Sequence, residues 1–131
     1  MKWISKGKKK TYSIKRFFKS FYYAFSGIKS ALKTEQNFLI DIIIAIIVLV
    51  GGYFLKLNTT EFAIIVFAIG LVICLELINT AIEYTIDMAM PEIHPLAKSA
   101  KDIASAAVLF SVIVAISVGL IIYLPKIIAL F

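Results

Sequence analysis

The chain has 131 residues, of which 61% are hydrophobic, and a formal net charge of +6. An ordinary soluble domain is only about 45–50% apolar, so this composition excludes a typical soluble protein and indicates one membrane-embedded domain. Ten of the fourteen Lys and Arg residues lie between Lys2 and Lys33. Because a basic segment beside so much hydrocarbon suits an anionic lipid surface, we expect a membrane contact here and no nucleic-acid partner.

The N-terminal part is predicted to be a basic tail, residues 1–11, followed by an amphipathic helix, residues 12–34. Apolar side chains recur in the helix at steps of three and four residues, and basic side chains fall on its other faces. These apolar positions are Ile14, Phe17, Phe18, Phe21, Phe25, Ile28 and Leu32. The pattern is typical of a helix lying in the membrane interface, whereas a helix packed only on protein would need less positive charge.

Three long apolar runs follow and predict transmembrane helices at 38–56, 61–86 and 103–124. Each run approaches or exceeds the roughly 20 residues that cross the hydrocarbon core, and open strands are excluded because lipid cannot satisfy their backbone. We expect a tight turn at 56–61 and a longer polar loop at about 87–102. The predicted fold class is an all-α membrane protein, with a surface helix followed by three transmembrane helices.

The distribution of charge predicts the orientation in the membrane. The N-terminal block and the second loop, with Lys98 and Lys101, are more basic than the first loop, which has only Lys56. The positive-inside rule therefore predicts a multi-pass protein with a cytoplasmic N-terminus and second loop. We expect the membrane to be the plasma membrane. Three helices enclose little space, so we expect any sizeable active site to be shared between subunits.

Polar side chains interrupt the second apolar run over the stretch ELINTAIEYTID, which begins at Glu76 and ends at Asp87. At about 100° per residue, Glu76, Glu83 and Asp87 fall within about 40° of one another on one helix face, and Asn79 and Thr80 flank them. Each carboxylate at membrane depth costs at least about 2.5–3.5 kcal/mol, so the set requires a metal, a cation or a proton. We therefore favour a functional site over a set of polar residues that only holds neighbouring helices together.

The depth of each carboxylate suggests its chemistry. Glu83 lies about 10 Å nearer the cytoplasm than Glu76, level with Glu35 before the first span. Two surface carboxylates suit Mg²⁺, which takes oxygen ligands and often bridges substrate phosphates. Glu76 lies where a lipid hydroxyl at the headgroup boundary could reach it, as a general base requires.

The second loop carries groups that suit a nucleotide. Lys101 could neutralise a transferring phosphoryl group, and Asp102 could accept a hydrogen bond from an adenine amine. The sequence has no GxxxxGK[ST] motif, so side chains would have to hold the nucleotide. His94 by itself carries little weight, because a lone loop histidine is more often a surface residue.

The stretch from Glu76 to Asp87 resembles the ExxN[ST]AIExxxD signature of the small prokaryotic diacylglycerol kinase family. The stretch HPLAKSAKDIASAAV, from His94 to Val108, resembles a second block of that family, and the likeness extends over residues 15–124. The resemblance implies a surface helix and three transmembrane helices in a homotrimer with shared active sites. It also implies transfer of the γ-phosphoryl group of Mg·ATP to a lipid alcohol.

The resemblance implies roles for individual positions. Glu76 matches the general base, Asn79 its polar neighbour, and Glu35 and Glu83 the metal-binding glutamates. The positions that match lipid-substrate contacts are Arg16, Asp41 and Glu76. The positions that match ATP contacts are Tyr23, Glu35, Glu83, Glu92, His94, Lys101 and Asp102. Ile93 departs from the tyrosine usual in the family, so a nucleotide contact there must be apolar or through the backbone.

The Lys-rich N-terminus and the His-Pro-Leu-Ala-Lys form resemble the Gram-positive branch of the family, which acts chiefly on undecaprenol and makes undecaprenyl phosphate. Diacylglycerol, which would give phosphatidic acid, is the alternative acceptor. A small ion transporter is a hypothesis of another class, because membrane carboxylates also mark ion paths. The third apolar run carries no charge between Asp102 and Lys126, however, so no continuous path is visible. A catalytically inactive membrane scaffold is the third hypothesis.

Overall fold

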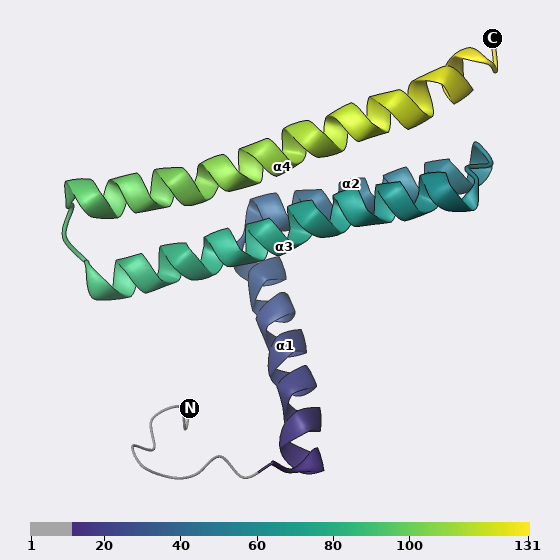
Figure 1. Ribbon diagram of the computed structural model, residues 1–131. Helices are drawn as coiled ribbons and strands as arrows, with labels where there is room; N and C mark the ends of the chain where they lie inside the picture. The colour runs from purple at the N-terminus through teal and green to yellow at the C-terminus, as the bar shows by residue number, and fades with distance from the viewer. Residues whose placement is uncertain (1–11) are drawn as a thin grey trace.

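A computed structural model describes residues 12–131, and the predicted basic tail at 1–11 lies outside this range. The described residues form four helices, which are α1 (Ile14–Thr34), α2 (Gln36–Phe54), α3 (Thr59–Ala89) and α4 (Pro95–Ile128). The last three are long and apolar enough to cross a membrane. In Figure 1, α3 packs along both α2 and α4, and α1 stands across them where α2 begins. The predicted all-α membrane fold, with one helix before three spanning helices, is confirmed.

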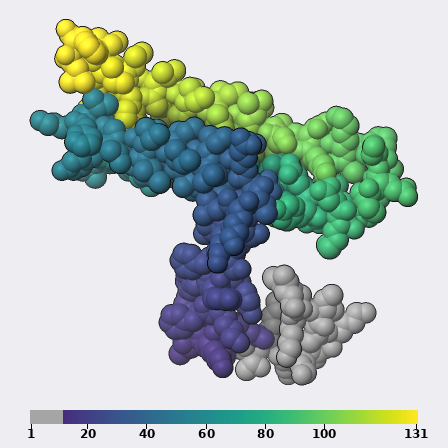
Figure 2. All heavy atoms as spheres, turned by 180° about the vertical axis from the view of Figure 1, so that it is seen from behind, coloured from purple at the N-terminus to yellow at the C-terminus, as the bar shows by residue number. Residues whose placement is uncertain are grey.

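The aromatic side chains of helix α1 are exposed in the described part of the chain, and several of their rings contact one another within the helix. Ser13 caps the helix, and its hydroxyl accepts a hydrogen bond of 3.2 Å from the backbone N–H of Arg16. Ala31, near the other end, is the one buried residue of α1. Figure 2 accordingly shows α1 projecting away from the three long helices. Exposed aromatics such as Phe17 and Phe18 beside basic residues fit a helix in the membrane interface.

The connection between α2 and α3 is held by local hydrogen bonds. Lys56 adopts a left-handed φ of 57°, and the N–H groups of Lys56 and Leu57 donate to the carbonyls of Tyr53 and Gly52. This is the Schellman arrangement that ends a helix. Asn58 and Glu61 then form a reciprocal capping box with two bonds of 2.9 Å, so α3 begins at Thr59.

The predicted polar loop over 87–102 is wrong, because most of that stretch is helical. Helix α3 continues to Ala89 and α4 starts at Pro95, which leaves only residues 90–94 as a connection. The loss of apolar character ended the predicted spans, but it does not end the helices. His94 caps α4 by accepting from the N–H of Leu96 at 3.1 Å, and proline favours the first helical position.

The extra helical turns extend α3 and α4 past the other elements. The 31 residues of α3 measure about 46 Å, against a hydrocarbon core of about 30 Å. In Figure 1 both helices continue beyond the level at which α1 joins the bundle. The polar residues near the α3–α4 connection therefore lie on a helical hairpin that projects on the side of α1.

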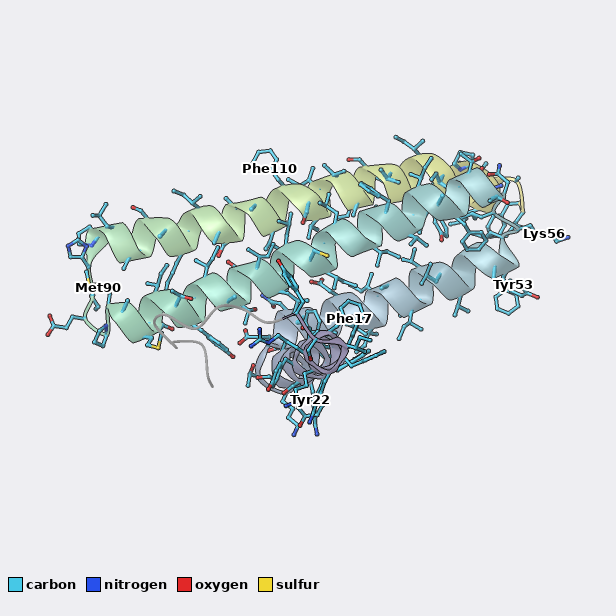
Figure 3. All side chains as sticks on the ribbon, turned by 60° about the horizontal axis from the view of Figure 1, so that its bottom comes forward. Phe17, Tyr22, Tyr53, Lys56, Met90 and Phe110 are labelled. Carbon is cyan, nitrogen blue, oxygen red and sulfur yellow. The ribbon has the colours of Figure 1, made fainter. Side chains whose placement is uncertain are left out.

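Outside the contacts between helices, the three long helices present apolar side chains outwards. Phe110 and Tyr53, which point away from the ribbon in Figure 3, are 70% and 74% exposed. The contact between α2 and α4 is more limited, and Tyr123 makes it by donating a hydrogen bond of 2.6 Å to the carbonyl of Val48. Tyr123 therefore joins the two outer helices at the end of the bundle remote from α1.

Gly52 lies at the contact between Tyr123 and α2, where there is no space for a larger residue. A Cβ atom there would lie 2.7 Å from the Tyr123 hydroxyl and 3.2 Å from side-chain atoms of Leu57 and Phe62. We expect Gly52→Ala to destabilise the fold by about 1–3 kcal/mol, the usual cost of overpacking. Circular dichroism of the protein in detergent should show this as a lower melting temperature. Gly51→Ala is the control, because its Cβ would meet only Tyr123 at 3.9 Å. Equal melting temperatures for the two variants would contradict the prediction.

Candidate functional site

The polar side chains of α3 that lie deepest in its apolar stretch are buried by neighbouring helices. Glu76, Asn79 and Thr80 are only 4%, 8% and 7% exposed, and they are the buried polar residues of α3. Glu83 is half-buried one turn further along, and Asp87 is exposed at the next turn. The polar face of α3 thus runs from the protein interior at Glu76 to solvent at Asp87.

Four carboxylates gather around the buried end of this face. The charges of Asp41, Glu83 and Glu35 all lie close enough to interact with that of Glu76. We call Glu35, Asp41, Glu76 and Glu83 the carboxylate cluster. Asp41 comes from the first turns of α2, and Glu35 from the junction between α1 and α2. Like charges in a desolvated region repel one another, so this arrangement attracts cations or protons.

Glu35 is held by hydroxyl groups from two elements. Its Oε1 atom accepts hydrogen bonds from the Tyr84 hydroxyl at 3.0 Å and from the Thr34 hydroxyl at 3.3 Å. The hydroxyls of Tyr84 and Thr34 are themselves 2.8 Å apart. Because Tyr84 follows Glu83 in the chain, these bonds place Glu35 at the level of Glu83 along α3. Sequence reasoning missed Tyr84, and the only signal for it was a phenol directly after Glu83 in the polar stretch.

Asn79 links the buried and exposed parts of the cluster. Its Nδ2 donates to Glu83 at 3.3 Å, which leaves its Oδ1 atom buried without a hydrogen-bond partner in the described structure. Buried polar atoms are almost always satisfied, so an orphaned carbonyl oxygen indicates a donor or cation that completes the site.

The oxygen atoms of this region fit a magnesium ion that is shared with a substrate. Within residues 12–131, no three His, Cys, Asp or Glu side chains are arranged to hold a metal by themselves. The available donors are the carboxylates of Glu35 and Glu83 and the orphaned Asn79 Oδ1. Mg²⁺ is usually bound through one or two carboxylates together with substrate phosphates and water, rather than by an all-protein cage. This donor set is of that kind.

A polar cavity lies next to the cluster, between the end of α3 and the start of α4. It has a volume of about 360 Å³, and its charged or titratable lining residues are Asp87, Glu92, His94, Lys98, Lys101 and Asp102. Lys101 forms an ion pair with Asp87, and Lys98 lies 2.5 Å from Asp102. Since Asp87 is one helical turn beyond Glu83, the cavity begins about 6 Å from the cluster. The structure therefore brings Glu92, His94, Lys101 and Asp102 together.

Arg16 and Tyr23 do not reach either of these regions within one chain. Both lie on α1, and Tyr23 is 64% exposed. Counting back from Thr34, Tyr23 lies about 16 Å and Arg16 about 27 Å along the helix axis. Of the residues predicted for the site, a single chain thus assembles the carboxylate cluster with Asn79 and, beside it, the polar cavity, but not the two positions on α1.

Comparison with known proteins agrees with this architecture. The family model for prokaryotic diacylglycerol kinase matches residues 22–123. The chain is 44% identical over 113 residues to an undecaprenol kinase of Bacillus subtilis, which covers 86% of this chain and 92% of that protein. It is 38% identical to a diacylglycerol kinase of Synechocystis, over 85% of this chain and 64% of the relative. It is also 38% identical to a diacylglycerol kinase of Helicobacter pylori, over 79% and 81% of the two chains. This chain therefore belongs to the prokaryotic diacylglycerol kinase family.

Proposed function

We propose that this protein is an ATP-dependent lipid kinase that phosphorylates the hydroxyl group of undecaprenol. The observation that carries the proposal is the carboxylate cluster around the buried Glu76 of α3. This cluster lies one helical turn from a cavity lined by basic and acidic side chains that suit a nucleotide. The relative from Bacillus subtilis, named an undecaprenol kinase, supports undecaprenol as the acceptor. Diacylglycerol is the second candidate, because other relatives are named diacylglycerol kinases.

Glu76 is the proposed general base. The lipid hydroxyl oxygen forms a new bond to the γ-phosphorus of ATP, and the bond from that phosphorus to the β,γ-bridging oxygen breaks, which releases ADP. The proton of the lipid hydroxyl passes to the Glu76 carboxylate, and from there to solvent. Asn79, one turn away on the same face, orients the reacting groups. Phosphoryl transfer depends mainly on such positioning and on charge neutralisation.

Glu35, Glu83 and the Asn79 Oδ1 atom would hold Mg²⁺, with ATP phosphates as further ligands. A divalent cation at this position supplies charge neutralisation for the phosphates. The chain's own contribution is to hold the carboxylates of Glu35 and Glu83 in fixed positions. Tyr84 and Thr34 do so by hydrogen bonding Glu35 from α3 and from the end of α1.

The polar cavity is the proposed site for the rest of the nucleotide. Lys101 would exchange its ion pair with Asp87 for one with a phosphate, and Asp102 would accept from the adenine amine. Glu92 and His94 complete the ATP contacts, and Ile93, which is fully exposed, offers only an apolar surface or its backbone. These groups lie on the projecting hairpin, so we propose that this end of the bundle is cytoplasmic and that the membrane is the plasma membrane.

A homotrimer with shared active sites is the proposed assembly. Arg16 and Tyr23, proposed to contact lipid and ATP, lie too far along α1 to serve the cluster of their own chain. The large apolar outer surface of the bundle leaves room for neighbouring copies as well as lipid. In such an assembly, α1 of one subunit would meet the cluster of the next.

Turnover on two lipids tests the function and the acceptor together. With purified protein, Mg·ATP and equal surface concentrations of undecaprenol and dioleoylglycerol in one detergent, we expect kcat/KM to be at least about tenfold higher for undecaprenol, within the range that an apolar binding site discriminates. Labelled lipid products are resolved by thin-layer chromatography. A preference for dioleoylglycerol would overturn the choice of acceptor, and the absence of phosphorylation of either lipid would overturn the kinase.

A further inference from the structure

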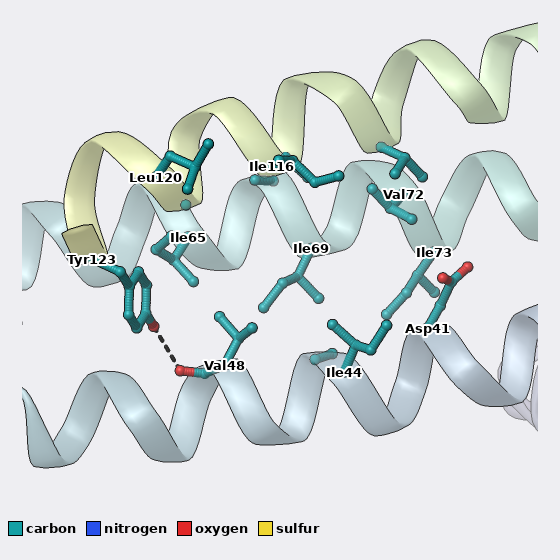
Figure 4. Close-up of a pocket in the computed structure, with 15 residues that line it drawn as sticks. Asp41, Ile44, Val48, Ile65, Ile69, Val72, Ile73, Ile116, Leu120 and Tyr123 are labelled. Atoms are coloured by element: carbon teal, nitrogen blue, oxygen red, sulfur yellow. Dashed lines mark hydrogen bonds between the residues drawn. The ribbon is translucent and has the colours of Figure 1, made fainter. Parts of the chain in front are cut away.

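A second cavity, apolar throughout most of its length, lies between α2, α3 and α4. Its volume of about 410 Å³ is within the roughly 300–1,000 Å³ usual for small-molecule sites. Aliphatic side chains such as Ile65, Val72 and Ile116 line its walls. Figure 4 shows Asp41 at one end of it and Tyr123 at the other. Nothing in the magnesium or nucleotide chemistry above uses this space.

The Asp41 end connects the cavity with the carboxylate cluster. Asp41 lines the cavity, and its charge interacts with that of Glu76. A molecule with a hydroxyl group at Glu76 and an apolar chain would therefore extend directly from the cluster into the cavity. The distance available is about 10 Å along α2 from Asp41 to Val48, and about 16 Å along α4 from Val112 to Tyr123.

Tyr123 closes the end of the apolar cavity that is remote from Asp41. Its position favours a hydrocarbon chain over a helix of a second copy as the occupant of the cavity. The Tyr123 hydroxyl donates its one proton to the Val48 carbonyl, so it bridges α2 and α4 and has no further proton to donate to a ligand. A straight helix from a second copy, about 10 Å across, could not lie along the cavity without breaking this bridge. A flexible hydrocarbon chain leaves the bridge intact, because it can turn before Tyr123 and leave between α2 and α4.

We propose that this cavity binds the first isoprene units of the lipid alcohol, and that Gly119 fixes how far the chain can enter. This inference rests on the proposed kinase function and adds where the acceptor tail binds. Gly119 lines the cavity on α4, one turn from Tyr123, and a Cβ atom there would meet nothing within 4 Å. A larger side chain at Gly119 would thus have room at its Cβ atom, and its remaining atoms would shorten the cavity at the far end.

Acceptors of different length test this proposal. For each variant, kcat/KM is measured with undecaprenol and with prenol, whose single isoprene unit stops short of Gly119, about 10 Å along α4 from Val112. We expect Gly119→Leu to lower the undecaprenol-to-prenol ratio of kcat/KM at least about tenfold, the scale of discrimination by an apolar pocket, and Gly119→Ala to lower it less. Gly70→Leu is the matched control. A Cβ at Gly70 also meets nothing within 4 Å, but Gly70 does not line the cavity, so the ratio should stay at the wild-type value.

The outcomes separate this proposal from the kinase function itself. If wild-type protein phosphorylates undecaprenol but Gly119→Leu leaves the ratio unchanged, the tail does not bind in the cavity. A change of mass in size-exclusion chromatography with light scattering, together with equal loss on both acceptors, would instead assign the cavity to a second copy of the chain. Since Gly119→Ala adds only one methyl group, it keeps the test decisive if Gly119→Leu does not fold. The absence of any wild-type activity would overturn the proposed function.

Discussion

Replacing Glu76 by glutamine should lower lipid phosphorylation by about 10²–10⁴-fold, the usual contribution of a general base. The substitution preserves the shape of a side chain that is only 4% exposed, and it removes a charge from the crowded carboxylate cluster. We therefore expect the folded protein to be at least as stable as the wild type. Transfer of label from [γ-³²P]ATP to undecaprenol measures the activity, and the melting temperature in detergent measures stability.

Glu61→Gln is the control for Glu76→Gln. It is the same substitution in the same helix, but at the opposite end, where Glu61 caps α3 and pairs with Lys126 at 3.2 Å. A glutamine can still complete the capping box, so only the half-buried ion pair with Lys126 is lost. Activity of Glu61→Gln should be close to wild type. If Glu76→Gln retained comparable turnover, Glu76 could not be the base.

Replacing Glu83 by glutamine should raise the Mg²⁺ concentration that gives half-maximal activity. Loss of a residue that merely orients a metal ligand typically weakens metal binding about 10–100-fold, so loss of a ligand should cost no less. Glutamine can still accept the 3.3 Å hydrogen bond from Asn79, so the local structure should persist. A titration of activity with Mg²⁺ at saturating ATP measures the shift.

The Glu83 variant also differs from the Glu76 variant in how it responds to magnesium. High Mg²⁺ should restore part of the activity of Glu83→Gln, because the cation can still bind through Glu35, Asn79 and the nucleotide. It should restore none in Glu76→Gln, which lacks the base. An unchanged Mg²⁺ requirement in Glu83→Gln would contradict its role as a ligand.

The broad architecture follows from hydrophobic patterning, because length and apolar content decide which segments can span a membrane. The same reasoning fails at residues 87–102, because a rise in polarity does not end a helix there. Ion pairs such as Lys101 with Asp87, together with the His94 cap, keep polar residues helical beyond the hydrocarbon. Hydropathy indicates whether a helix is surrounded by lipid or by water. Where a helix ends depends instead on capping residues and ion pairs, which average hydropathy does not detect.

The carboxylate cluster could be predicted in part. Helical periodicity brought Glu76, Asn79 and Glu83 onto one face, because spacing alone determines which residues share a face. It could not indicate that Tyr84, on a different face, reaches across to Glu35, since this contact depends on how α1 and α2 meet α3. The apolar cavity was not predicted either, because its walls are ordinary aliphatic residues of three separate helices.

Equilibrium binding of ATP to the two glutamine variants tests the central claim, that the cluster divides into a base and a metal-binding pair. The measurement is made on purified protein with and without Mg²⁺, in the absence of lipid. Glu76→Gln should bind Mg·ATP with wild-type affinity although its turnover is greatly reduced. Glu83→Gln should lose the part of the affinity that depends on Mg²⁺. Equal loss of Mg·ATP binding in both variants, or none in either, would contradict the division of roles.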